Sequence, residues 1–258
     1  MLRSLIAAYN SLLSAIRKDP FFATGWNELD EIKEHSLTRT DISDHLTTLF
    51  VEATAVQPRL IVELGVRAGN GSTFVLERVA RLCGSKLIGV DIQDCSTISS
   101  YDDWIFEQSD DIDFAKRFET WCGQRQIKPH IDVLVIDTSH VFEHTVDEIG
   151  HWFPFLSDKS KVFFHDTNLG KIYFRKNGSI VVGWDNKRGV IAALENFFAR
   201  PFNEKEHFID WAKGWTIRHY PYCAGLTVLE RVTSQRVPHV NDRPSMSCMR
   251  DECTEVQQ

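Results

Sequence analysis

The sequence predicts an α/β protein built on a doubly wound, mostly parallel sheet. Short apolar segments alternate with helical segments along most of the chain, which is typical of such sheets. Several apolar segments end in acidic residues, and the first of them leads into a turn that contains Gly65, Gly69 and Gly71. Because ligands of these sheets bind beyond the carboxyl ends of the strands, we expect the functional residues at those ends.

The individual elements follow from hydrophobic periodicity and from turn residues. The expected strands are 59–66, 86–91, 103–108, 131–137, 161–166 and a closing antiparallel pair at 215–219 and 225–229. Helices are expected over 1–17, 72–83, 114–121, 142–153 and 188–199. Capping-type side chains at Thr40, Asp41 and Ser43 precede Leu46 and indicate one more helix, which leads into the first strand.

Composition bounds the class of protein. The 258 residues are 43% hydrophobic and 25% charged, and the formal net charge is -7, so no global basic surface favours nucleic acid. No run approaches the roughly 20 apolar residues that span a membrane. Six cysteines at irregular spacings indicate reduced thiols and a cytoplasmic location. We expect a helical extension over 1–39, one domain over 40–232 and a disordered tail over 233–258.

The turn after the first strand differs from the dinucleotide pattern G-x-G-x-x-G. It is written Glu63-x-Gly65-x-x-x-Gly69-x-Gly71-Ser72. This spacing resembles motif I of class I S-adenosylmethionine-dependent methyltransferases, which implies a Rossmann-like fold and that cofactor. The alternative is a tight connection between strand and helix with no ligand.

Asp91 ends the second strand, 26 residues after Gly65 (91 minus 65). A carboxylate there accepts hydrogen bonds from both hydroxyls of a ribose. The resemblance implies that Asp91 binds the cofactor ribose and that Glu63, the glycines and Ser72 lie along its amino-acid end. Asp137 is a further cofactor-binding candidate.

By the same resemblance, an acid after the third strand binds the adenine amino group. Asp110 is the candidate and Asp111 is a close rival. The alternative for this pair is a solvated helix start, where Asp is common as a cap.

Two further strand ends carry Asp137-Thr-Ser-His140 and His165-Asp166. Oxygen ligands from two carboxylates suit a divalent cation, and an imidazole nearby suits proton transfer. The layout resembles small-molecule O-methyltransferases of the family that includes cephalosporin-biosynthesis and macrolide-sugar methyltransferases. This resemblance implies that Asp137 and Asp166 bind magnesium or manganese and that His140 is the general base.

His165 departs from that family, which has two adjacent acids at this place. Three alternatives stay open: a magnesium site completed by Asn168 or water, a transition-metal site that uses His165, or no metal, with Asp166 orienting a partner. His140 and His144 also match the spacing of a zinc-binding H-x-x-x-H helix, although Val141 replaces the glutamate of metalloproteases.

We therefore expect a methyltransferase that uses S-adenosylmethionine to methylate the oxygen of a small hydroxylated acceptor. Trp184 is the expected lid residue. A homo-oligomer is left open. The alternatives are a non-catalytic protein that binds S-adenosylmethionine, and a nicotinamide-dependent oxidoreductase, which would lack its usual glycine pattern here.

Overall fold

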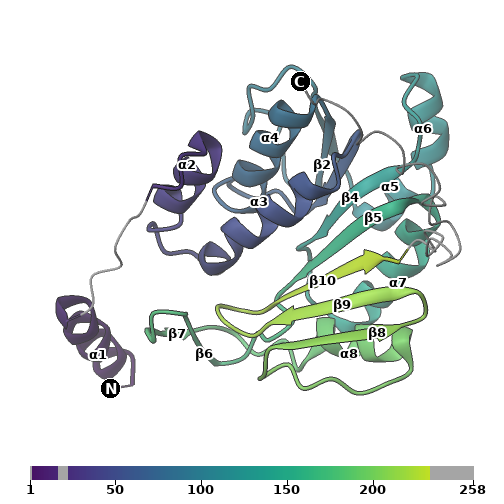
Figure 1. Cartoon of the computed structure of the whole chain (residues 1–258). Coiled ribbons are helices and arrows are strands. Elements are labelled where there is room, and N and C mark those ends of the chain that lie inside the picture. Colours follow the sequence, from purple (N-terminus) through teal and green to yellow (C-terminus); the bar gives the residue numbers. More distant parts are fainter. Residues whose placement is uncertain (1, 17–22, 233–258) are drawn as a thin grey trace, which may run out of the picture.

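The computed structural model describes residues 2–16 and 23–232, and its centre is an eight-stranded sheet in the order β3-β2-β1-β4-β5-β10-β9-β8 (Figure 1). The parallel part contains β1 (Leu60–Leu64), β2 (Lys86–Asp91), β3 (Trp104–Gln108), β4 (Ile131–Ile136) and β5 (Leu156–His165). The antiparallel part contains β8 (Phe208–Ala212), β9 (Trp215–Tyr220) and β10 (Leu226–Arg231), and β10 pairs with β5. The predicted fold class is confirmed.

Strand order reverses at β1, which pairs with β2 on one side and with β4 on the other. Val62 of β1 lies opposite Ile88 of β2 on one side and opposite Leu134 of β4 on the other. Every residue of β1 and β4 is buried, because helices cover both faces of the sheet. The connections that leave β1 and β4 therefore separate at the carboxyl edge and open a crevice there.

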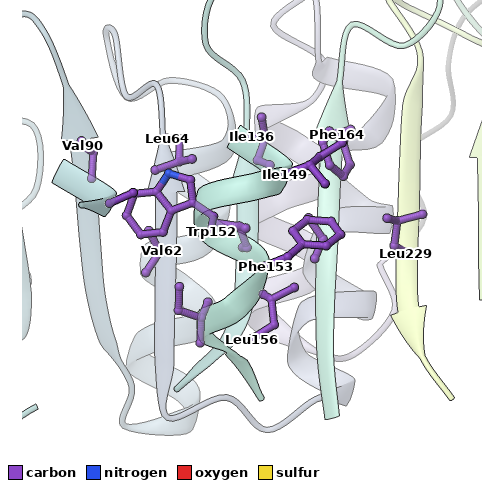
Figure 2. Close-up of a cluster of buried hydrophobic side chains, with 14 of the residues drawn as sticks. Val62, Leu64, Val90, Ile136, Ile149, Trp152, Phe153, Leu156, Phe164 and Leu229 are labelled. Atoms are coloured by element: carbon purple, nitrogen blue, oxygen red, sulfur yellow. The ribbon is translucent and has the colours of Figure 1, made fainter. Parts of the chain in front are cut away.

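Helices divide the core into two layers (Figure 1). One face of the sheet packs against α2 (Asn27–His35), α3 (Leu46–Ala55) and α4 (Ser72–Cys83), and the other against α5 (Asp111–Ala115), α6 (Phe118–Gln124), α7 (Phe142–Trp152) and α8 (Gly189–Phe198). Figure 2 shows Trp152 and Ile149 of α7 packed over strand residues such as Val62 and Ile136. Short 3-10 helices occupy Ser43–His45 and Phe153–Phe155.

Three local predictions were wrong. The helix expected through 114–121 is split into α5 and α6, because Arg117 leaves the helical conformation between them. The side chains expected to cap α3 do not cap it; Ser43 Oγ instead donates to the carbonyl of Thr40. Three strands were not expected: β8 and the hairpin of β6 (Ile172–Phe174) and β7 (Ile180–Val182). Strands of three residues are too short to show a period.

The N-terminal helix α1 (Leu2–Ile16) stands beside the β6–β7 hairpin and away from the main sheet (Figure 1). The Asn10 side chain joins it to the hairpin, because its amide nitrogen donates to Ile180 O at 2.8 Å and its oxygen accepts from Ile180 N at 2.9 Å. None of the helices within the described residues is long and apolar enough to cross a membrane. The predicted tail over 233–258 lies outside the described residues.

Candidate active site

The glycine turn brings the ends of β1 and β4 into direct contact. Gly65 has a φ of +88°, and a Cβ at this position would lie 2.1 Å from the carbonyl oxygen of Asp137. Asp91 holds the next residues of the turn, since its Oδ2 accepts hydrogen bonds from the amides of Val66 and Arg67 at 2.9 Å each. A side chain at residue 65 would therefore force the two strand ends apart.

Two adjoining cavities follow this turn along the carboxyl edge of the sheet. The first, of about 320 Å³, is lined by residues 40–42 and 65–72, which include Gly69, Gly71 and Ser72. The second, of about 340 Å³, is lined by Asp91, residues 109–111, Ser139 and His144. Gly65, Arg67 and Asp137 line both cavities. One elongated ligand can therefore occupy the two cavities together.

The two acids after β3 both line the second cavity, but each already has a local partner. Asp110 Oδ1 accepts from the amides of Ile112 and Asp113 at 3.0 Å, which caps α5 as the alternative interpretation expected. Asp111 Oδ1 lies 2.9 Å from Nε2 of His144. This contact raises the pKa of His144 to about 9.

Glu63 lies beneath the turn and does not line either cavity. Its side chain is fully buried, and its Oε2 accepts a hydrogen bond from Thr73 Oγ1 at 2.8 Å. Its second oxygen has no hydrogen-bond partner. Burial raises the pKa of Glu63 to about 8, and the hydroxyl donors Ser72 and Thr73 offset this only in part.

Asp137, His140 and Asp166 meet because β4 and β5 are parallel neighbours whose carboxyl ends lie together. His140 Nε2 lies 3.0 Å from Asp166 Oδ2, and His140 Nδ1 lies 4.0 Å from Asp137 Oδ1. His140 has a φ of +58° in the turn before α7, so it reaches back over the strand ends. Asp166 Oδ1 is buried without a hydrogen-bond partner.

His165 is buried between acceptors. Its Nδ1 lies 3.0 Å from Asp137 Oδ1, and its Nε2 lies 3.3 Å from the carbonyl oxygen of Asp41. Since a carbonyl and a carboxylate only accept, both ring nitrogens donate and the ring is an imidazolium. Burial alone would lower the pKa of His165, but the carboxylates of Asp166 and Asp137 outweigh it and raise the pKa to about 10.

These contacts decide which side chains suit a metal. Both nitrogens of His165 are engaged as donors, so neither offers a lone pair to a cation. At the ends of β4 and β5, the donor atoms of Asp137, His140 and Asp166 gather within 4.8 Å of one another. Two carboxylates, one with an oxygen that accepts no hydrogen bond, fit a divalent cation by the chemistry of the donors.

Three further points concern the H-x-x-x-H alternative, the expected lid residue and the residues near the site that the sequence did not indicate. The H-x-x-x-H alternative is wrong, because His140 precedes α7 while His144 lies within it. Trp184 is 52% exposed and its ring centroid lies 5.9 Å from that of His140. The sequence did not predict that Asp41 and Glu148 belong to the site. The Asp41 carbonyl contacts His165 and Glu148 contacts Thr138, but no local spacing connects either residue with these strand ends.

Comparison with known proteins adds to this geometry. Residues 62–167 match the family described as a methyltransferase domain. They run from β1 to the turn after β5 and contain Gly65, Asp91, Asp137, His140 and Asp166. No curated protein matches the chain in sequence.

Solved methyltransferases share the fold at low sequence identity. A putative O-methyltransferase from Klebsiella pneumoniae has a TM-score of 0.51 and 12% identity over 88% of this chain and 97% of its own. The SAH-bound methyltransferase PaMTH1 of Podospora anserina has a TM-score of 0.50 and 12% identity, over 88% of this chain and 95% of its own.

The MycE methyltransferase of mycinamycin biosynthesis, in complex with Mg, SAH and mycinamycin VI, has a TM-score of 0.51 and 18% identity. That match covers 84% of this chain but only 57% of MycE. The predictions of a Rossmann-like fold and of a methyltransferase are confirmed.

Proposed function

We propose that this methyltransferase transfers the methyl group of S-adenosylmethionine to a hydroxyl oxygen of a small molecule. The observation that carries the proposal is that the cavities and the cluster of histidines and acids meet at the end of β4. Asp137 lines both cavities, and it also lies beside His140 and His165. A methyl donor in the cavities would thus present its sulfonium next to a candidate base. The solved neighbours that contain SAH support the choice of cofactor.

The two cavities suggest an orientation for the cofactor. Asp91 and Asp110 line the second cavity, which suits the ribose and the adenine. The first cavity, with the glycine turn and Ser72, suits the amino-acid end. Asp91 Oδ2 holds the amides of Val66 and Arg67, so the same carboxylate would order the turn and bind the ribose.

His140 is the proposed general base. Its Nε2 donates to Asp166 Oδ2, which orients the ring and leaves the Nδ1 lone pair to accept the hydroxyl proton. Asp166 then acts as a positioning residue in the way that a triad carboxylate does. The enzyme's remaining task is to align the acceptor oxygen, the methyl carbon and the sulfur, because the sulfonium supplies its own leaving group.

Asp137 and Asp166 are the proposed ligands of a divalent cation, magnesium or manganese. A cation there would lower the pKa of the acceptor hydroxyl. The MycE structure contains Mg, which supports this part of the proposal by similarity of fold. The cytoplasmic location and a homo-oligomer stay predictions.

Cofactor class is tested by thermal unfolding with saturating S-adenosylhomocysteine, with NAD as the matched control. A ligand at about 100 times its dissociation constant adds about 2.7 kcal/mol, which for this length raises the midpoint by roughly 5–10 °C. A shift with NAD alone would overturn the proposal in favour of an oxidoreductase. An unchanged midpoint with both ligands would count against any bound nucleotide cofactor.

The base is tested with His140→Gln against His151→Gln, a change at a half-buried histidine near the end of α7. We expect the first variant to lose about 10²–10⁴-fold in turnover with near-normal cofactor affinity, and the second to keep its activity. Equal activity of the two variants would remove His140 as the base. Loss of activity with a chelator, and its return with magnesium or manganese, would support the cation.

A further inference from the structure

A second cluster of metal-ligating side chains lies away from the proposed catalytic residues. It consists of Asp111 at the start of α5 and of His144 and Glu148 on α7. His144 and Glu148 are four residues apart and share one face of that helix. Nε2 of His144 lies 2.9 Å from Asp111 Oδ1 and 3.7 Å from Glu148 Oε1.

The two carboxylates are buried with part of their hydrogen-bonding capacity unused. The Glu148 side chain has no exposed surface and that of Asp111 is 8% exposed. Asp111 Oδ2 and Glu148 Oε2 each lack a hydrogen-bond partner. Buried carboxylate oxygens are normally satisfied, because leaving one unpaired costs about 1–3 kcal/mol or more. Two such oxygens in one cluster are free to accept a positively charged ligand.

The donor atoms have the spacing of ligands around one metal ion. Bonds of about 2.0–2.2 Å to nitrogen and oxygen place neighbouring ligand atoms roughly 3–3.5 Å apart. The observed separations of 2.9 and 3.7 Å bracket that range, so a cation that replaces the proton between His144 Nε2 and Asp111 requires little rearrangement of the side chains. Thr138 donates its hydroxyl hydrogen to Glu148 Oε1, which orients this carboxylate as outer-shell partners of metal ligands do.

We propose that Asp111, His144 and Glu148 bind a first-row transition-metal dication such as Zn²⁺. One imidazole and two carboxylates favour such an ion over magnesium, for which imidazole is a poor ligand. Asp111 and His144 also line the second cavity, so water or a ligand can complete the coordination from that side. If Asp111 binds the metal, Asp110 is the acid that remains for the adenine amino group. The site does not depend on the proposed methyl transfer.

The proposal is tested by equilibrium dialysis of the metal-free full-length protein against Zn²⁺ alone, and by the visible absorption of added Co²⁺. Three variants separate the clusters: Glu148→Gln and His144→Gln alter this site, and Asp166→Asn alters the other. Gln at 144 can still donate to Asp111 but lacks the imidazole ligand. Circular dichroism and the S-adenosylhomocysteine shift report independently on folding and on the cofactor.

We expect Glu148→Gln and His144→Gln each to weaken Zn²⁺ binding by about 100-fold or more and to abolish the Co²⁺ bands. Asp166→Asn should retain both signals. Equal Zn²⁺ binding by the wild type and Glu148→Gln, or no binding by a folded wild type, would overturn the proposal and leave a hydrogen-bonded network. A normal S-adenosylhomocysteine shift in that case shows that only this inference has failed.

Discussion

The parallel and antiparallel halves of the sheet each bury one histidine, and the two differ in charge. His165 is the last residue of the parallel strand β5 and is 1% exposed, while His219 of β9 is fully buried. His165 faces Asp137 and the Asp41 carbonyl, so both of its nitrogens donate. His219 Nδ1 accepts from Thr227 Oγ1 at 2.8 Å, and its Nε2 donates to the Glu204 carbonyl at 2.9 Å, which describes a neutral ring.

Their pKa values follow these partners. Burial lowers the pKa of His219 to about 4, because only the Glu204 backbone and carboxylate oppose it. Burial acts on His165 in the same direction, yet Asp166 and Asp137 raise its pKa to about 10. Burial therefore does not decide the charge of a histidine. The carboxyl edge of the parallel strands gathers acids, whereas the antiparallel half offers hydroxyl and carbonyl groups.

The largest expected effect comes from the close approach of Gly65 to the backbone that follows β4. Gly65→Ala should destabilise the protein by more than about 4 kcal/mol, because its Cβ would lie 2.1 Å from a backbone oxygen at a φ of +88°. Gly214→Ala, in the β8–β9 hairpin, is the control, since its φ is +77° but no atom lies within 4 Å. We expect about 1 kcal/mol there. Urea unfolding measures the loss of stability in both variants. Equal losses would show that the contact between residue 65 and the Asp137 carbonyl adds nothing to the cost of the positive φ.

A second prediction concerns alkaline pH. His165 has a pKa of about 10 in the folded state against 6.5 for an unperturbed histidine, so its contribution is complete below pH 6.5 and is lost as pH rises through 10. His165→Gln should lack this alkaline loss of a few kcal/mol, although it is less stable at pH 6. The measurement is the free energy of unfolding of wild type and variant from pH 6 to 10. Parallel profiles would contradict the imidazolium.

His219 should show the opposite dependence. Its pKa of about 4 lies below the 6.5 of an unperturbed histidine, so its contribution is present above pH 6.5 and is lost as pH falls through 4. The wild type should lose about 3 kcal/mol over that interval from this group, and His219→Gln should not. Unfolding between pH 4 and 7 compares the two. An acid loss of the same size in the variant would show that His219 is not its source.

The smallest effect is expected at the surface of the antiparallel half. Arg200 and Asp210 form an ion pair at 3.0 Å with 43% and 28% of the side chains exposed. Arg200→Ala should cost less than about 1 kcal/mol, because solvent screens such pairs. Urea unfolding at low and high salt provides the check. A cost above 2 kcal/mol would mean that charges matter as much in this half as at the acidic edge.

Local patterns in the chain were enough to predict most of the elements. The helix over 72–83 and the strand over 86–91 were placed at the observed bounds, because periodicity and terminal turn residues act within a few positions. Short or edge strands such as β6 and β8 were missed for the same reason. Three-residue strands and outward-facing apolar side chains, such as Ile209 and Trp211, do not produce a buried alternating pattern.

The sequence by itself determined the alternating fold, the glycine turn and the set of acids at the strand ends. Each of these depends on neighbouring residues. The tertiary structure decided which of them meet: His140 and not His165 offers a free nitrogen beside Asp137 and Asp166, and Asp111 contacts His144. Several of the contacts at the strand ends join distant residues, with 26 positions between Asp166 and His140, 33 between His144 and Asp111 and 124 between His165 and Asp41. Only strand order and helix packing bring such residues together, and their charges follow from the contacts that result.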